Sequence, residues 1–131
     1  MGAAENDAIV RRIFDAFARQ EGLALRGLFG ADAVWTVPGR GVMAGVHRGR
    51  DEIFRFLARL RTETDGTYGS TLSDVLASND RAAALYTARG RRRGRELELE
   101  QLLLFRMDDG VVREVLALPS DPVAFEEFWA P

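Results

Sequence analysis

The only histidine of the sequence, His47, is the side chain best suited to move a proton near neutral pH. It lies in the stretch from Val34 to Arg50, which also holds Trp35, Pro38 and four glycines. An aromatic residue, a proline that ends a strand and a glycine-rich loop are together typical of a pocket wall and its mouth. We expect His47 to act as a general base and Arg40 to hold a carboxylate or enolate oxygen. The alternative is that the stretch is an ordinary connection with an exposed histidine and arginine.

Two tyrosines, Tyr68 and Tyr86, offer hydroxyls that could donate into a cavity. We expect either Arg40 or Tyr86 to support an oxyanion, and Trp35 to stack on a flat ligand. Simple burial of these aromatic residues is the alternative. The other residues expected to shape a ligand site are Phe14, Phe17, Phe54, Gln101, Leu103 and Leu116.

Alternation of charge and apolar residues runs along the segment from Arg95 to Met107. Glu96, Glu98 and Glu100 fall on one face of a strand, because side chains of a strand alternate between its two faces. We predict that this face meets solvent or a polar dimer surface, although a glutamate held inside a cavity would have a raised pKa and could act as a base. The opposite face then carries Gln101, Leu103 and Phe105 inward, which leaves Leu102 and Leu104 for a sheet or dimer interface.

Composition excludes several kinds of chemistry. The 131 residues contain no cysteine, no lysine and one histidine, so disulfides, thiolate nucleophiles, lysine Schiff bases and cysteine–zinc sites are excluded. We expect no metal and no cofactor. A net charge of −2 argues against general nucleic-acid binding. No apolar run reaches the roughly 18 residues of a membrane span, and the first residues do not resemble a signal peptide, so we expect a cytoplasmic protein without a membrane partner.

The elements that must position these residues follow from periodicity and turn signals. A first helix capped by Asn6 carries an apolar face. Leu25, Leu28 and Phe29 suggest a short second helix, and Asp51 lies in the first turn of a third helix. A strand over 33–37 ends at Pro38, and a loop covers 40–49. Four closely spaced strands over 67–77, 81–89, 95–107 and 111–118, with turns at 78–80, 90–94 and 109–110, predict an antiparallel meander, followed by a closing helix over 123–129. The prediction is one α+β domain over residues 1–131, with three N-terminal helices on the concave face of a curved antiparallel sheet and a cone-shaped cavity between them.

Three segments give the chain a resemblance to a known superfamily: AFARQEGLALRGLFGADAVWTVPG, AGVHRGRDEIFRFLARL, and LLLFRMDDGVVREVLALPSD. They resemble the cone-shaped α+β barrel of nuclear transport factor 2, ketosteroid isomerase and, most of all, the SnoaL-like polyketide cyclases. The resemblance covers nearly the whole chain. It implies a fold that hosts isomerases, cyclases, epoxide hydrolases, dehydratases and non-catalytic binders, and the SnoaL-like cyclases need no metal or organic cofactor.

The ketosteroid isomerase pattern is not preserved at the positions that the resemblance assigns. Its general-base aspartate falls on Val37, its oxyanion tyrosine on Ile13 or Phe14, and its second oxyanion donor near Leu102 or Leu103. Apolar residues at all of these positions argue against steroid isomerisation by the same groups. The Arg-x-Asp pair of limonene epoxide hydrolases has a counterpart only at Arg106-Met107-Asp108, which we expect to be a solvated strand end.

We therefore expect a cofactor-independent protein that binds an apolar cyclic or aromatic small molecule. Proton-transfer chemistry from His47, such as cyclisation, isomerisation or dehydration, is the catalytic form of this hypothesis. The alternative is a non-catalytic ligand-binding or dimerisation module of the same fold. The apolar sheet face at Leu102 and Leu104 predicts a homodimer.

Overall fold

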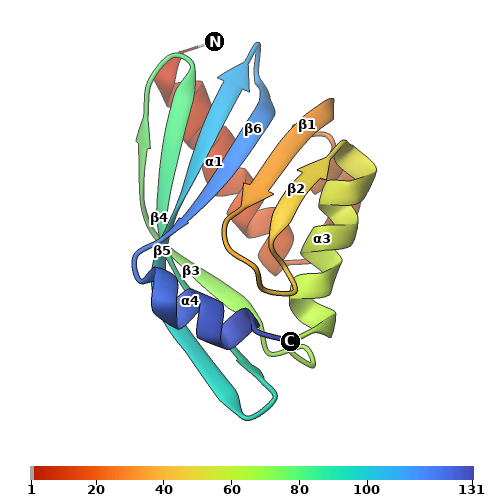
Figure 1. Ribbon diagram of the computed structural model, residues 1–131. Helices are drawn as coiled ribbons and strands as arrows, with labels where there is room; N and C mark the ends of the chain where they lie inside the picture. Colours follow the sequence, from red (N-terminus) through yellow and green to blue (C-terminus); the bar gives the residue numbers. More distant parts are fainter. Residues whose placement is uncertain (1) are drawn as a thin grey trace.

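The structure is a computed structural model that describes residues 2–131. Two helices and two strands are followed by a third helix, four consecutive strands and a closing helix (Figure 1). The helices are α1 (Ala3–Ala18), α2 (Gly22–Arg26), α3 (Arg50–Thr62) and α4 (Pro122–Trp129). The strands are β1 (Phe29–Val37), β2 (Gly45–Arg48), β3 (Gly69–Ala77), β4 (Arg81–Arg92), β5 (Arg95–Asp108) and β6 (Val111–Pro119). None of the helices within residues 2–131 is long and apolar enough to cross a membrane.

All six strands form one curved sheet in the order β2-β1-β6-β5-β4-β3. Helix α1 packs against β3 and β4, and α3 packs against β1 and β2, so the two helices cover the concave side from opposite ends of the strand order (Figure 1). The helix α4 lies against β5 and closes one end. The predicted α+β architecture, a curved sheet with helices around a cone, is confirmed.

Two features of the sheet differ from the prediction. Strand β1 pairs with β6 in parallel, with Trp35 opposite Val115, so the sheet is not purely antiparallel. The tight turns between β3, β4, β5 and β6 make these neighbours antiparallel. No such turn joins β1 with β6, so the sequence did not indicate that these two strands run parallel. Residues 45–48, predicted as loop, form the edge strand β2 beside β1. Side chains along β2 do not alternate between buried and exposed. The alternation of apolar and polar residues that usually predicts a strand is therefore missing there.

Asn6 does not cap the first helix as predicted. The cap is Gly2, whose backbone N–H donates to the Glu5 carboxylate at 2.8 Å. Asn6 lies one turn further on and is fully buried. Its side-chain amide donates to the carbonyls of Ser78 and Asn79, each at 3.0 Å, so it ties α1 to the turn between β3 and β4.

The turn and cap signals near the C-terminus are confirmed, apart from one boundary. Asp109 and Gly110 have φ of 51° and 81°, the left-handed pair of a tight hairpin turn. Asp121 caps α4 by accepting from the Ala124 N–H at 3.1 Å. The turn predicted over 90–94 is shorter, because β4 continues to Arg92.

Candidate ligand-binding cavity

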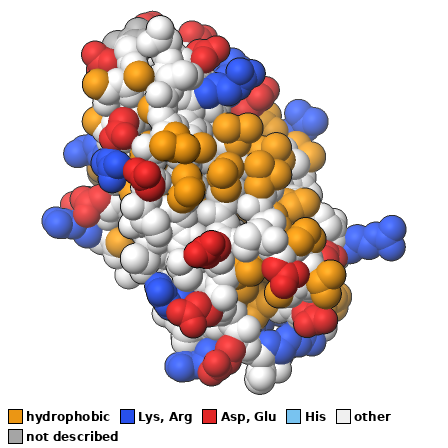
Figure 2. Space-filling model, turned by 90° about the vertical axis from the view of Figure 1, so that its left-hand side faces the viewer, with side chains coloured by type: hydrophobic (Ala, Val, Ile, Leu, Met, Phe, Trp, Pro, Cys, Tyr) orange, Lys and Arg blue, Asp and Glu red, His pale blue; other side chains and the backbone are white. Residues whose placement is uncertain are grey.

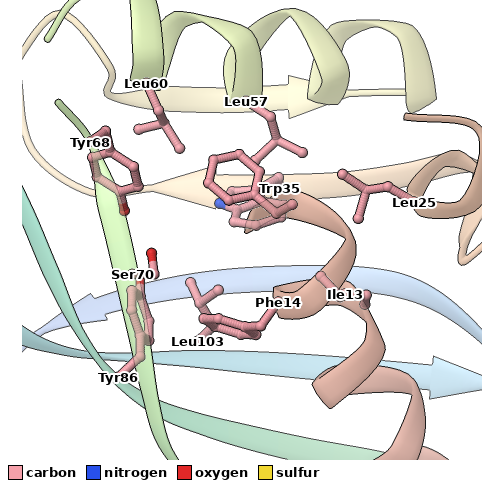
Figure 3. A pocket seen from close by; sticks show the side chains of 11 residues that line it. Ile13, Phe14, Leu25, Trp35, Leu57, Leu60, Tyr68, Ser70, Tyr86 and Leu103 are labelled. Atoms are coloured by element: carbon pink, nitrogen blue, oxygen red, sulfur yellow. The ribbon is translucent and has the colours of Figure 1, made fainter. Parts of the chain in front are cut away.

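The space between the concave sheet and its helices holds two adjoining chambers. The first has a volume of about 50 Å³. Figure 3 shows its lining side chains, which converge from α1, α2, α3 and the sheet. They are Ile13, Phe14, Phe17, Leu25, Trp35, Leu57, Leu60, Tyr68, Ser70, Tyr86 and Leu103.

The second chamber, of about 40 Å³, extends toward α4. It shares five side chains with the first, which are Trp35, Leu60, Tyr68, Tyr86 and Leu103. Its remaining walls are Val37, Met43, Phe56, Gln101, Ala117, Phe125 and Trp129. A water molecule occupies about 30 Å³ of liquid, so each chamber in this shape admits only a very small guest.

Tyr86 and Gln101 form a buried polar pair at the floor of the cavity. They are register partners on β4 and β5, and the Gln101 side-chain amide donates to the Tyr86 hydroxyl at 2.8 Å. Burial raises the pKa of Tyr86 well above its ordinary value, while the hydrogen bond from Gln101 opposes that rise. The hydroxyl therefore stays protonated and keeps its own hydrogen for another acceptor.

Tyr68 and Ser70 add two hydroxyls on one face of the start of β3. Burial raises the pKa of Tyr68, and the neighbouring Ser70 hydroxyl acts in the opposite direction. The Tyr68 ring meets the edge of Phe17, with ring centroids 6.2 Å apart. Both tyrosines thus present neutral hydroxyls to an otherwise apolar space.

Trp35 forms the wall between the chambers. Its ring lies against Phe29, with centroids 6.2 Å apart, and against Phe56 at 5.4 Å. Its backbone pairs with both β2 and β6, so the side chain is held from several directions. The indole nitrogen is buried and has no hydrogen-bond partner.

The cavity approaches the surface between α1 and the start of β3. The half-buried members of its lining are Phe14 and Phe17 of α1 and Tyr68 and Ser70 near β3, while the others are buried. The sequence predicts the mouth at the loop over 40–49, of which Met43 alone lines a chamber. That loop is instead joined to the C-terminal region, because the Val42 N–H donates to the Trp129 carbonyl at 2.9 Å.

His47 and Arg40, the predicted base and oxyanion partner, do not line either chamber. His47 lies opposite Trp35 in the β1–β2 pair, but the ring of Phe56 stacks on its imidazole with centroids 4.4 Å apart. Its Nε2 lies 3.3 Å from the Met43 carbonyl oxygen. Arg40 is exposed, and its backbone N–H contacts the Glu126 carboxylate.

Phe54 and Leu116 also lie outside the chambers. Phe54 is on another side of α3, edge-on to Phe29 and beneath the Arg26 guanidinium. Leu116 faces outward from β6 and is 37% exposed, because the parity of β6 turns Val115 and Ala117 inward. The structure does bring together Trp35, Phe14, Phe17, Tyr68, Tyr86, Gln101 and Leu103.

Several lining residues were not singled out as ligand contacts from the sequence. Ser70 is the most informative, since it is two residues after Tyr68 and a strand alternation would have placed both on one face. Leu57 and Leu60 were recognised only as the buried stripe of α3. Phe56 was missed in favour of Phe54, because the direction in which α3 faces the sheet depends on tertiary packing.

The positions assigned by the ketosteroid isomerase pattern do face the cavity, with apolar side chains. Val37, Ile13, Phe14 and Leu103 all line a chamber. Arg106, by contrast, pairs with Glu114 at 3.3 Å beside the turn at the end of β5. Within residues 2–131 no group of three histidine or acidic side chains comes close enough to hold a metal ion.

A family model for the SnoaL-like domain matches residues 10–115. The chain belongs to the SnoaL-like family. An uncharacterised protein of Mycobacterium tuberculosis is 37% identical over 123 residues, which are 93% of this chain and 94% of that protein. The predicted superfamily is therefore confirmed.

Solved structures agree with this assignment. Bal32a, from a soil-derived mobile gene cassette, is 34% identical with a TM-score of 0.93, over 97% of this chain and 98% of that one. A nuclear transport factor 2-like protein of Burkholderia xenovorans is 22% identical with a TM-score of 0.84, over 98% of each chain. A putative SnoaL-like polyketide cyclase from Jannaschia sp. is 17% identical with a TM-score of 0.79, over 98% of this chain and 94% of that one. The last two are similar in fold alone.

Proposed function

We propose that this SnoaL-like protein binds a small, mostly apolar ring molecule in the two-chambered cavity. The observation that carries the proposal is the lining itself, in which aromatic and aliphatic walls surround a few convergent polar groups. Such a combination is typical of small-molecule sites. Movement of the half-buried Phe17 and Tyr68 at the mouth would enlarge the space for a ring.

The lining favours binding over acid–base catalysis by His47. A general base must lie within hydrogen-bond reach of the proton that it removes, or one water away. The Phe56 ring stacks on His47, and the lining residues from the described part of the chain carry no carboxylate and no arginine. The cavity's titratable groups are tyrosines whose raised pKa keeps them protonated.

Titration calorimetry with ethylbenzene and acetophenone tests this proposal. We expect saturable binding of both probes by the wild-type protein. Ser70→Phe places a ring at the mouth and should weaken the affinity for both by at least about tenfold, through overlap with the guest. Ser73→Phe is the matched control, because Ser73 is exposed on the same strand and should leave the affinity unchanged. Absence of binding by the wild-type protein, or equal effects of the two variants, would contradict the proposal.

We infer further that the protein forms a homodimer through the outer face of its sheet. Figure 2 shows apolar side chains gathered across the middle of one side of the molecule. The outward apolar residues of this part of the sheet are Leu102, Leu104, Leu116 and Leu118. A groove of about 480 Å³ on this face includes Leu104 and Leu116 in its lining. Its polar lining residues are Thr36, Arg48, Arg81, Arg106 and Glu114.

A second copy of this chain is the occupant that we infer for that face, because its leucines form one apolar patch on the outside of the sheet. Charged residues flank the leucines at both ends. Glu96 and Glu98 lie opposite Arg91 and Arg89. Arg106 lies opposite Arg81 and 3.3 Å from Glu114. A two-fold axis near Leu102 and Leu104 would bring the leucines of the two copies together and leave charges of both signs at each rim. Self-complementary patches of this kind suit an isologous interface.

A further inference from the structure

The Trp35 indole N–H is a hydrogen-bond donor without an acceptor. The residue is only 6% exposed, and its Nε1 atom is buried with no partner. A buried polar group without a partner destabilises the fold, and the indole nitrogen can act only as a donor. The contacts of the ring with Phe29 and Phe56 hold it in this orientation. The fold therefore keeps a donor unpaired next to an internal space.

The cavity directs other donors toward the same region. In Figure 3 the indole nitrogen of Trp35 and the hydroxyl oxygens of Tyr68 and Ser70 point into one part of the chamber. Nearby, the Tyr86 hydroxyl accepts from Gln101 at 2.8 Å and keeps its own hydrogen to donate. All of these groups are neutral.

This set of groups defines what the guest must offer. A guest with a hydrogen-bond acceptor satisfies the indole, whereas a hydrocarbon leaves it unpaired. An anionic acceptor would have to give up its hydration with no arginine in the lining to balance its charge, which is costly in an apolar site. The complementary group is therefore an uncharged acceptor oxygen on a ring-shaped body.

We propose that Trp35 is the specificity-determining residue of the cavity and that its Nε1–H donates to a carbonyl oxygen of the ligand. The ligand class is then a neutral cyclic or aromatic ketone, aldehyde or quinone. This inference rests on the proposed function, since it assigns an atom-level role inside the same cavity.

The test compares two probes of similar shape in two proteins. Acetophenone carries a carbonyl where ethylbenzene carries a methylene, and Trp35→Phe keeps an aromatic wall but removes the N–H. The quantity compared is the ratio of the Kd for ethylbenzene to the Kd for acetophenone. A change in cavity volume affects both probes alike, so it leaves this ratio unchanged. We expect this ratio to fall by about fivefold to tenfold in Trp35→Phe, the value of one buried hydrogen bond.

An indole N–H signal gives a second readout. The two tryptophans give two indole signals in a ¹⁵N–¹H correlation spectrum, and Trp129→Phe assigns them. Acetophenone should move the Trp35 signal downfield, and ethylbenzene should not. A ratio unchanged in Trp35→Phe, together with equal shifts from both probes, would overturn the role of Trp35 while leaving the proposed function intact. Failure of the wild-type protein to bind either probe would overturn both.

Discussion

Gln101 and Tyr86 face each other across β5 and β4, and the 2.8 Å hydrogen bond between them is buried beneath the cavity. The pair fixes the Tyr86 hydroxyl and stabilises a polar group that burial would otherwise penalise. Gln101→Leu removes the donor and leaves the hydroxyl with one partner fewer. We expect the free energy of unfolding to fall by about 1–2 kcal/mol, measured by urea denaturation.

Combining Gln101→Leu with Tyr86→Phe separates the hydrogen bond from packing. Tyr86→Phe removes the hydroxyl and leaves the ring, which meets Phe14 at 5.2 Å. If the pair acts as a unit, the double variant loses less stability than the sum of the single losses, with a coupling of about 1 kcal/mol. Strict additivity would contradict a direct interaction between the two side chains.

The two tyrosines should make the stability of the protein fall at alkaline pH. Burial raises the pKa of Tyr86 well above the value near 10 of a free tyrosine and raises that of Tyr68 as well. The folded state thus favours the protonated phenols. This contribution to stability is fully present below about pH 10 and is lost as the pH rises through the higher folded pKa.

Ultraviolet absorbance at alkaline pH measures this effect directly, because Tyr68 and Tyr86 are the only tyrosines. At pH 10–11 the native protein should show less phenolate absorbance than the unfolded protein, whose tyrosines should titrate near 10. Tyr86→Phe should make the loss of stability above pH 10 shallower. Native-state titration of both phenols near 10 would contradict their burial.

Arg92 should hold the C-terminal helix in place. Its buried guanidinium donates to the Glu63 carboxylate at 3.2 Å and to the Ala130 carbonyl at 2.6 Å. Arg92→Leu should lower the free energy of unfolding by about 1–3 kcal/mol and speed amide exchange in α4, since these bonds are lost. The neighbouring Arg91 is exposed, so Arg91→Leu should alter neither quantity. Identical exchange in both variants would show that α4 does not depend on Arg92.

The proposed dimer face predicts a charge-sensitive association. Leu116→Arg places a charge on the outer apolar face and should shift the protein from dimer to monomer in sedimentation equilibrium. Leu23→Arg is the control, because Leu23 is 90% exposed on helix α2 and lies outside this face. A monomeric wild-type protein, or a Leu116→Arg variant that remains dimeric, would contradict the interface.

Local signals predicted most of the framework. The Asp109-Gly110 turn, the Asp121 cap and the alternation along β5 each depend on neighbours in sequence, and each agrees with the structure. The parallel pairing of β1 with β6 depends on contacts between distant segments, so no nearby turn revealed it.

The same reasoning explains which parts of the site could be predicted. Trp35, Tyr86 and Leu103 face the cavity because their strands alternate, and a period of two is visible in sequence. The place of His47 depends on where α3 puts Phe56, and the mouth depends on how α1 meets β3. Both depend on how separate helices and strands pack together, and the sequence around His47 carries no information about that packing.

A crystal structure of the protein with acetophenone, at a concentration well above its measured Kd, tests the central claim most directly. We expect density for the ring among Trp35, Tyr68 and Tyr86, with the ketone oxygen about 3 Å from the indole nitrogen. An empty cavity, or density for acetophenone only on the outer surface, would contradict the assignment of this cavity as the ligand site.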